Sequence, residues 1–313
     1  MSTLQLSDTG DLARLELLDH HSTDWDRVRE TSYLVHQRLR YDYPGPIRDL
    51  RQRLVLIPPD THVDQRRVLH RLDVSAPGAR RRERSDRFGN LVVDVRVPHV
   101  EAAIEFEAWA VVTRSNAPRS EDAAADPRLL VPTRLTRPDP VLRRVAAGLV
   151  AGPGGGALAE RICHWVYGEI EYEYGLTDIH TTAAEALALG RGVCQDKAHV
   201  MLALCRLAGL PSRYVSGHLL GEGASHAWVE VMVPEPGRGS VVMALDPTHD
   251  RAADLGYVTI AVGRDYADVA PMSGSYAAPY AGRLTVTKRV GLAAVDYGTG
   301  APAGVAGPAR AAV

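Results

Sequence analysis

The sequence predicts an α+β protein, in which an N-terminal antiparallel β-sandwich is followed by helices packed on an antiparallel sheet. Apolar residues alternate with period two from Tyr33 to Thr113, as they do in strands with one buried face. Helical patterns then occupy residues 141–207, and three short strand patterns follow them between Tyr214 and Leu245. The 313 residues can hold about two such domains.

The N-terminal half is expected to be the sandwich. Residues 31–118 form this domain, after an N-terminal extension over residues 1–30. Turn signals separate its strands, namely at residues 44–46, 58–60, 76–78 and 89–90. Within it, the charged run Ala-Arg-Arg-Arg-Glu-Arg at residues 79–84 is interpreted as an exposed hairpin tip rather than an anion site.

The middle of the chain changes character. Residues 119–140 contain many Pro, Asp and Ala residues without a sustained period, which is typical of a linker. A core over residues 141–290 follows, and its first two helices are expected at residues 141–150 and 157–172, on either side of a Gly-Pro-Gly-Gly-Gly break.

Clear capping signals delimit the next elements. Thr182 and Glu185 form a capping box and Gly190 a left-handed stop, so a short helix is expected between them. A further helix begins near Cys194, and strands follow at residues 214–220, 226–233 and 241–245. Residues 291–313 are expected to be a flexible tail, because their Gly, Ala and Pro content offers little to bury.

Composition excludes several classes of protein. Lys and Arg total 36 against 38 Asp and Glu, so no global field favours nucleic acid or an anionic membrane. No segment resembles a signal peptide or reaches the roughly 20 apolar residues that span a bilayer. Three cysteines without CxxC spacing argue against a disulfide framework or a structural zinc site. We therefore expect a cytoplasmic protein.

Cys194 is the candidate nucleophile. It follows Gly192 and Val193 at the predicted first turn of a helix, where unpaired N–H groups and the helix dipole favour a thiolate. Cys163 and Cys205 lie inside helices among apolar neighbours, which is typical of buried structural cysteines.

A cysteine nucleophile needs a base and a group that orients the base. His226 begins the strand His-Ala-Trp-Val-Glu-Val, and Asp246 ends the next strand, Val-Val-Met-Ala-Leu-Asp. If residues 235–240 form the hairpin loop, the two side chains lie nearly opposite on one face, roughly 5 to 8 Å apart. The order Cys194, His226, Asp246 therefore predicts a catalytic triad for acyl transfer.

Two further residues are candidates for substrate binding. Gln195 directly follows the cysteine, and Trp228 shares the strand face of His226. The sequence has no HExxH, Walker, GxSxG or Rossmann glycine pattern, and we expect neither a metal ion nor a cofactor.

At these residues the chain resembles the bacterial transglutaminase-like proteins with an N-terminal β domain. The similar segments are TTAAEALALGRGVCQDKAHVMLALCRLAGLPSRYVSGHL, ASHAWVEV, ALDPTHD, GRDYADVAP and, in the N-terminal half, DRFGN. The resemblance spans residues 33–290 and implies a papain-like transglutaminase core, with Cys194 as nucleophile, His226 as base and Asp246 as acid. Lys197 departs from the family, in which an aromatic residue is usual at that position. The resemblance also hints at an ATP-grasp-like partner protein.

We therefore expect a cysteine enzyme that acts on amide bonds of a peptide or protein through a thioester. Hydrolysis ranks first, because members of this family are generally regarded as hydrolases. Amine transfer by a transglutaminase, or a biosynthetic acyltransferase or cyclase reaction, would use the same residues. An alternative of another class is a non-enzymatic scaffold in which the β domain binds a peptide.

Overall fold

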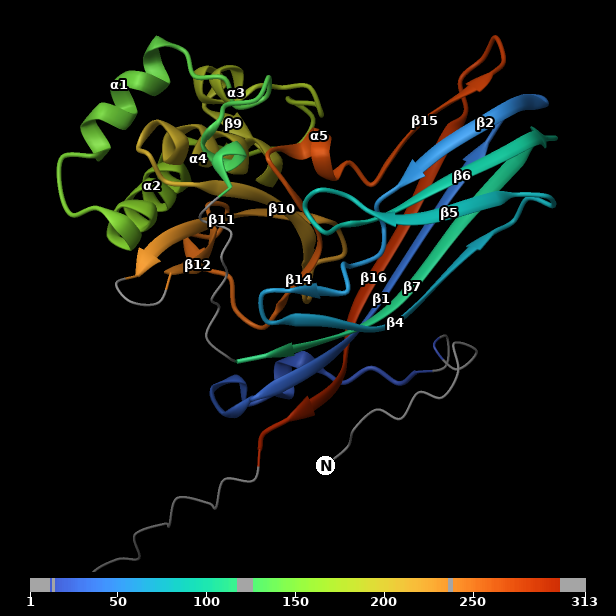
Figure 1. The fold of residues 1–313 in the computed structure, drawn as a ribbon, viewed down its shortest axis with the longest axis horizontal. Helices are drawn as coiled ribbons and strands as arrows, with labels where there is room; N and C mark the ends of the chain where they lie inside the picture. The colour runs from blue at the N-terminus through green and yellow to red at the C-terminus, as the bar shows by residue number, and fades with distance from the viewer. Residues whose placement is uncertain (1–11, 13–14, 117–125, 236–238, 299–313) are drawn as a thin grey trace, which may run out of the picture.

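The computed structural model describes residues 12, 15–116, 126–235 and 239–298 and has the expected α+β architecture. Figure 1 shows two parts, a long twisted β-sandwich and a helical layer that covers one side of a second, shorter sheet. No helix in these described ranges combines the length and the apolar character that crossing a bilayer requires.

The sandwich consists of two antiparallel sheets around one apolar core. One sheet has the order β16-β1-β7-β4-β3 and the other the order β15-β2-β6-β5. Phe106, Val95 and Leu39 belong to the core between them and are almost completely buried. The strands are β1 (Glu30–Asp42), β2 (Ile47–Leu54), β3 (Thr61–His62), β4 (Gln65–Val74), β5 (Arg80–Ser85), β6 (Leu91–Val100), β7 (Ala103–Ser115), β15 (Met272–Ala277) and β16 (Arg283–Asp296).

The last two of these strands correct the predicted domain boundaries. Residues 272–290 were assigned to the catalytic core and residues 291–313 to a flexible tail, yet β15 pairs with β2 and β16 pairs with β1 along its whole length. The chain therefore returns to the sandwich after the core. Residues 299–313, the rest of the predicted tail, lie outside the described residues.

The charged run at residues 79–84 is also placed differently from the prediction. It is not a hairpin tip, because Arg80–Ser85 forms the strand β5, which pairs with β6 at the edge of its sheet. All residues of β5 are exposed. Charged side chains are typical of edge strands, since they discourage pairing with a second chain.

The second part packs helices against the sheet β13-β12-β11-β10-β14. The central helix α4 (Cys194–Leu207) contacts β11 and β10, and its residues from Asp196 to Arg206 are buried. Around it lie α1 (Pro140–Leu149), α2 (Gly155–Glu169), α3 (Ala183–Leu189) and α5 (Tyr266–Val269). The strands are β10 (Ser212–Leu219), β11 (His226–Glu235), β12 (Gly239–Asp246), β13 (Arg251–Ala252) and β14 (Tyr257–Gly263), with a small parallel pair, β8 (Glu171–Tyr172) and β9 (Arg191–Gly192).

The sandwich closes the open edge of this sheet. The edge strand β14 would leave backbone groups unpaired, and side-chain amides of the N-terminal half bind them. Asn90 donates to the carbonyl of Val262 and accepts from its N–H, at 2.7 and 2.8 Å. Gln65 does the same at Thr259, at 2.8 and 2.9 Å. These specific contacts fix the two parts against each other.

A buried ion-pair cluster reinforces the same interface. His62 of the sandwich lies 3.0 Å from Glu230 of β11, and Arg213 of β10 donates to that carboxylate at 2.6 Å. All three side chains are less than a tenth exposed. Burial alone would raise the pKa of Glu230, but the charges of Arg213 and His62 outweigh it and hold this pKa far below its usual range.

Candidate active site

The start of α4 is held by a carboxylate that the sequence analysis missed. Asp196 Oδ2 accepts from the backbone N–H of Val193 at 2.8 Å and from the Thr177 hydroxyl at 2.7 Å. A Cβ atom on Gly192 would lie 2.7 Å from that same oxygen, so only glycine fits there. The available signal was an acidic residue three positions after Val193, the position that closes a capping box.

This clamp places Cys194 at the first turn of α4, as predicted, with a half-buried side chain. Cys163 and Cys205 are buried in the core, also as predicted. Burial raises the pKa of both of their thiols, that of Cys205 to about 12. Cys194 is thus the accessible thiol of the three.

His226 and Asp246 are paired across neighbouring strands. His226 Nε2 lies 2.8 Å from Asp246 Oδ2, and both side chains are buried. In the observed register Val229 faces Leu245. Asp246 therefore lies opposite Trp228, which is two residues after His226 and on the same face of the sheet. The predicted pairing of these residues is confirmed, with a diagonal contact between them.

Asp246 is the centre of a larger hydrogen-bond network. Its Oδ2 also accepts from His249 Nδ1 and from the Tyr257 hydroxyl, each at 2.7 Å. Its Oδ1 accepts from the backbone N–H of Thr248 at 2.8 Å. Sequence reasoning missed His249 and Tyr257. His249 stands three residues after Asp246 in Asp-Pro-Thr-His, which was the only local signal for it.

The charges of this network are strongly coupled. Burial by itself would lower the pKa of His226, but its hydrogen bond to Asp246, its interaction with Cys194 and the charges of those two groups raise this pKa well above its ordinary value. Burial would raise the pKa of Asp246, and the bonds from His226, His249 and Tyr257 reverse that and lower it. The arrangement therefore favours an imidazolium beside an ionised carboxylate.

Cys194 completes the row, and it lies close enough to the imidazole of His226 to raise the pKa of that ring. Because Nε2 is taken by Asp246, Nδ1 is the nitrogen that remains for the sulfur. The carboxylate of Glu222 lies 3.8 Å from this Nδ1 and 3.4 Å from Nε2 of His249. Glu222 is 39% exposed, so an acidic group stands between solvent and the two rings.

The two predicted substrate contacts are placed differently from each other. Gln195 is half-buried beside Cys194, and its amide donates to the backbone carbonyl of Asp178 at 3.4 Å. Trp228 is only 1% exposed, stacks against His226 and meets the ring of Tyr257 edge to face. This burial suits Trp228 to hold the imidazole ring rather than to touch a substrate.

Lys197, which departs from the family pattern, is buried under the same helix start. Its ammonium group lies 3.3 Å from the Tyr167 carbonyl and 5.1 Å from the centre of the Tyr167 ring. Burial lowers the pKa of Lys197. The residue thus serves as an internal contact between α4 and α2.

Two groups in the described part of the chain bring possible metal-ligand atoms within 4.8 Å of one another. One is Asp19 with His20 and His21, and the other is His226 with Asp246 and His249. In the second group one ring nitrogen of each histidine already binds the same carboxylate oxygen, Oδ2 of Asp246. Its geometry is therefore satisfied by hydrogen bonds between protein groups.

Comparisons with known proteins agree with this geometry. Residues 144–246 match the family model of the transglutaminase-like superfamily, and residues 33–113 match that of the bacterial transglutaminase-like N-terminal region. An uncharacterized protein of Mycobacterium leprae is 31% identical over 265 residues, which cover 74% of this chain and 88% of that protein. One from Mycobacterium tuberculosis is 30% identical over 277 residues, 77% of this chain and 86% of that protein.

The fold is similar to a crystal structure from Cytophaga hutchinsonii that is described as a candidate cysteine protease. The two agree with a TM-score of 0.70 at 24% identity, over 85% of this chain and 92% of the other. At this identity the similarity concerns the fold. It extends over the sandwich as well as the helical part, since it covers most of both chains.

Proposed function

This chain belongs to the transglutaminase-like superfamily, and from that premise we propose that it is a cysteine-dependent enzyme that hydrolyses amide bonds of a peptide or protein. The observation that carries the proposal is the row of Cys194, His226 and Asp246, in which the imidazole is hydrogen-bonded to the carboxylate at 2.8 Å and lies close enough to Cys194 for that group to raise its pKa. Such a row supplies a nucleophile, a proton carrier and an orienting acceptor, which are the parts that acyl transfer requires.

In the first step, the thiolate of Cys194 attacks the carbonyl carbon of the amide and forms a carbon–sulfur bond. The negative charge moves to the carbonyl oxygen, where N–H groups of the first turn of α4 can stabilise it. When the carbon–nitrogen bond breaks, the amine leaves with the proton of the His226 imidazolium. The products are a free amine and a thioester on Cys194.

In the second step, water attacks the thioester and His226 takes a proton from it. The carbon–sulfur bond breaks, a carboxylic acid leaves, and the thiolate and imidazolium are restored. Asp246 keeps the imidazole in one orientation and stabilises its charge throughout. The hydrogen bonds of His249 and of the buried Tyr257 in turn hold the carboxylate of Asp246.

Amine transfer is the second candidate reaction, in which a primary amine replaces water in the second step. Glu222 favours it, because a partly exposed carboxylate 3.8 Å from His226 can attract a protonated amine. Burial, together with the nearby charges of Cys194 and Glu222, raises the pKa of Tyr172, and this residue, 42% exposed, offers an aromatic surface for a cation. A transglutaminase or a biosynthetic acyltransferase would use these groups.

One experiment separates these reactions. The purified chain is incubated with a peptide library and a primary amine, and the products are analysed by mass spectrometry. Hydrolysis gives new carboxyl termini or converts side-chain amides to acids, while transfer adds the mass of the amine. Absence of both products would favour a non-enzymatic scaffold.

Three unpaired thiols are also typical of a reducing compartment such as the cytoplasm.

A further inference from the structure

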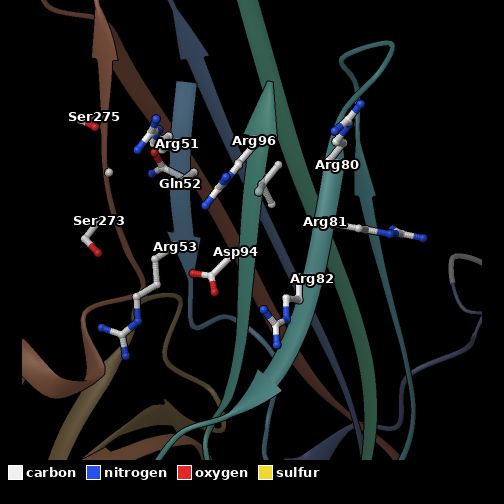
Figure 2. A pocket seen from close by; sticks show the side chains of 12 residues that line it. Arg51, Gln52, Arg53, Arg80, Arg81, Arg82, Asp94, Arg96, Ser273 and Ser275 are labelled. Atoms are coloured by element: carbon white, nitrogen blue, oxygen red, sulfur yellow. The ribbon is translucent and has the colours of Figure 1, made fainter. Parts of the chain in front are cut away.

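Arginines stand in cross-strand register on the outer face of the sheet β15-β2-β6-β5. Arg80 of β5 faces Arg96 of β6, and Arg96 faces Arg51 of β2. One pleat further along, Arg82 faces Asp94, and Asp94 faces Arg53. Figure 2 shows these side chains projecting from three neighbouring strands into one hollow. We call this surface the arginine face: Arg51, Arg53, Arg80, Arg82 and Arg96.

The pleat of the strands selects these residues. In β6, Val93, Val95 and Val97 point into the sandwich core, so Asp94 and Arg96 point outward. In β5, Arg81 and Glu83 lie on the opposite side from Arg80 and Arg82. There Arg81 donates to the carbonyl of Leu72 in β4, and in Figure 2 it points away from the hollow.

The arginine face has little internal compensation of its charge. Asp94 is the acidic residue among the residues that line the hollow, and Arg84 also binds it, at 3.0 Å. Arg53 lies 3.9 Å from Asp86. For Arg51, Arg80 and Arg96, no carboxylate of the described residues lies within 4.0 Å. Like charges directly opposite each other destabilise a sheet. The row of Arg51, Arg96 and Arg80 therefore lowers the stability of the free protein.

The size of the arginine face indicates which kind of ligand could compensate its positive charge. The hollow has a volume of about 570 Å³, and Ser273 and Ser275 of β15 extend it to a fourth strand. Four strands span roughly 14 Å, and the two rows of arginines lie about 7 Å apart. A single phosphate would reach only part of this area. Several carboxylates along one extended segment would match it, since guanidinium groups bind carboxylates in bidentate fashion.

We propose that the arginine face binds an acidic segment of another polypeptide, rich in Asp and Glu, which crosses the strands from β5 towards β15. Single-stranded nucleic acid fits less well, because the lining residues include no aromatic ring on which bases could stack. This inference is independent of the proposed reaction. It gives the sandwich a role in recruiting an acidic substrate or partner.

Fluorescence anisotropy with the full chain and fluorescein-labelled decaglutamate tests the proposal. The double variant Arg51→Gln/Arg96→Gln should bind this peptide at least about tenfold more weakly. Its matched control is Arg143→Gln/Arg144→Gln, which removes the same charge from exposed positions of α1. The control should bind as the unchanged chain does, because the net charge of −2 provides no general attraction for an acidic peptide.

Thermal unfolding of the same proteins guards against misfolding. Removal of two opposed arginines should leave Tm unchanged or raise it, and decaglutamate should raise Tm of the unchanged chain but not of the double variant. The proposal is overturned if the unchanged chain does not bind decaglutamate, or if both double variants lose affinity equally. It is also overturned if a thymidine decanucleotide binds more tightly than decaglutamate, or if millimolar inorganic phosphate binds as well as the peptide.

Discussion

His226 and His249 meet at one carboxylate oxygen, Oδ2 of Asp246, at 2.8 and 2.7 Å. The two rings lie 5.3 Å apart between centroids, and Glu222 approaches the far nitrogen of each. Asp246 is completely buried, so its position depends on these few donors. His249 therefore shares the carboxylate that orients the proposed base. Through Asp246 it can influence the orientation and the charge of His226 without contacting the sulfur of Cys194.

Replacement of His249 by Ala tests this influence. The acylation rate should fall on the order of tenfold, because Asp246 loses one of the donors that fix it. The alkaline limb of the pH–rate profile should move to higher pH, since the negative charge of Asp246 is then shared less and favours the His226 imidazolium more. His164, an exposed histidine bound to Asp250, is the control, and His164→Ala should change neither rate nor profile.

Cys194→Ala should abolish turnover, with a loss of roughly 10³-fold or more, while the protein remains folded. Iodoacetamide near neutral pH should label Cys194 and spare Cys163 and Cys205, whose buried thiols have raised pKa values. Mass spectrometry of tryptic peptides identifies the labelled site. Cys163→Ala and Cys205→Ala are the matched controls, and loss of turnover per folded molecule in either would mean that the nucleophile is misassigned.

Asp246→Asn should slow acylation by roughly 10² to 10⁴-fold and leave labelling of Cys194 detectable. The amide keeps the shape of the carboxylate but not its charge, so the imidazolium of His226 is less stable. The alkaline limb should consequently move to lower pH. Single-turnover kinetics measured across pH check both effects, and full activity of the variant would reduce Asp246 to a residue of the turn.

Glu222→Gln removes a carboxylate that lies 3.8 Å from His226 Nδ1. A nearby negative charge raises the pKa of an imidazole, so the alkaline limb should shift to lower pH in this variant. If amine transfer occurs, KM for a cationic amine should rise while KM for a neutral amine of similar size stays the same. An equal change for both amines would show that Glu222 does not recognise charge.

Glu230→Gln should lower the free energy of unfolding by about 3 to 5 kcal/mol at neutral pH, because it removes a buried negative charge that pairs with both Arg213 and His62. Urea unfolding measures this loss. The exposed pair of Glu173 with Arg191 gives the control, since Glu173→Gln should change stability by less than about 1 kcal/mol. A small effect of Glu230→Gln would mean that the interface cluster is not stabilising.

Glu230 also contributes to the loss of folding stability at acid pH. The pKa of Glu230 is lowered in the folded chain, so its stabilising contribution is present above the ordinary glutamate value of about 4.3 and is lost as pH falls below it. Glu230→Gln should therefore flatten the decline of stability in acid. An unchanged slope would assign the acid sensitivity to other carboxylates.

Much of this architecture could be predicted because it is local. Period-two alternation identified the strands of the sandwich, and the capping box at Thr182 and Glu185 placed α3 as observed. Gly192 and Val193, which precede Cys194, have no side chain that can cap a helix. The position of Cys194 at the start of α4 could still be predicted from the helical pattern of the residues after it. The hairpin between β11 and β12 is also local, so the contact of His226 with Asp246 could be inferred from its loop.

The partners that lie far apart in the chain were decided by tertiary structure. Alternation of Leu284, Val286, Val290 and Leu292 is compatible with a strand, but it does not say that β16 pairs with β1 at the other end of the chain. The register that places Arg51 of β2 opposite Arg96 of β6 has the same origin, because these strands are not consecutive in the chain. A strand pattern states which side chains share a face, whereas the neighbour of that face is chosen by packing of the whole core.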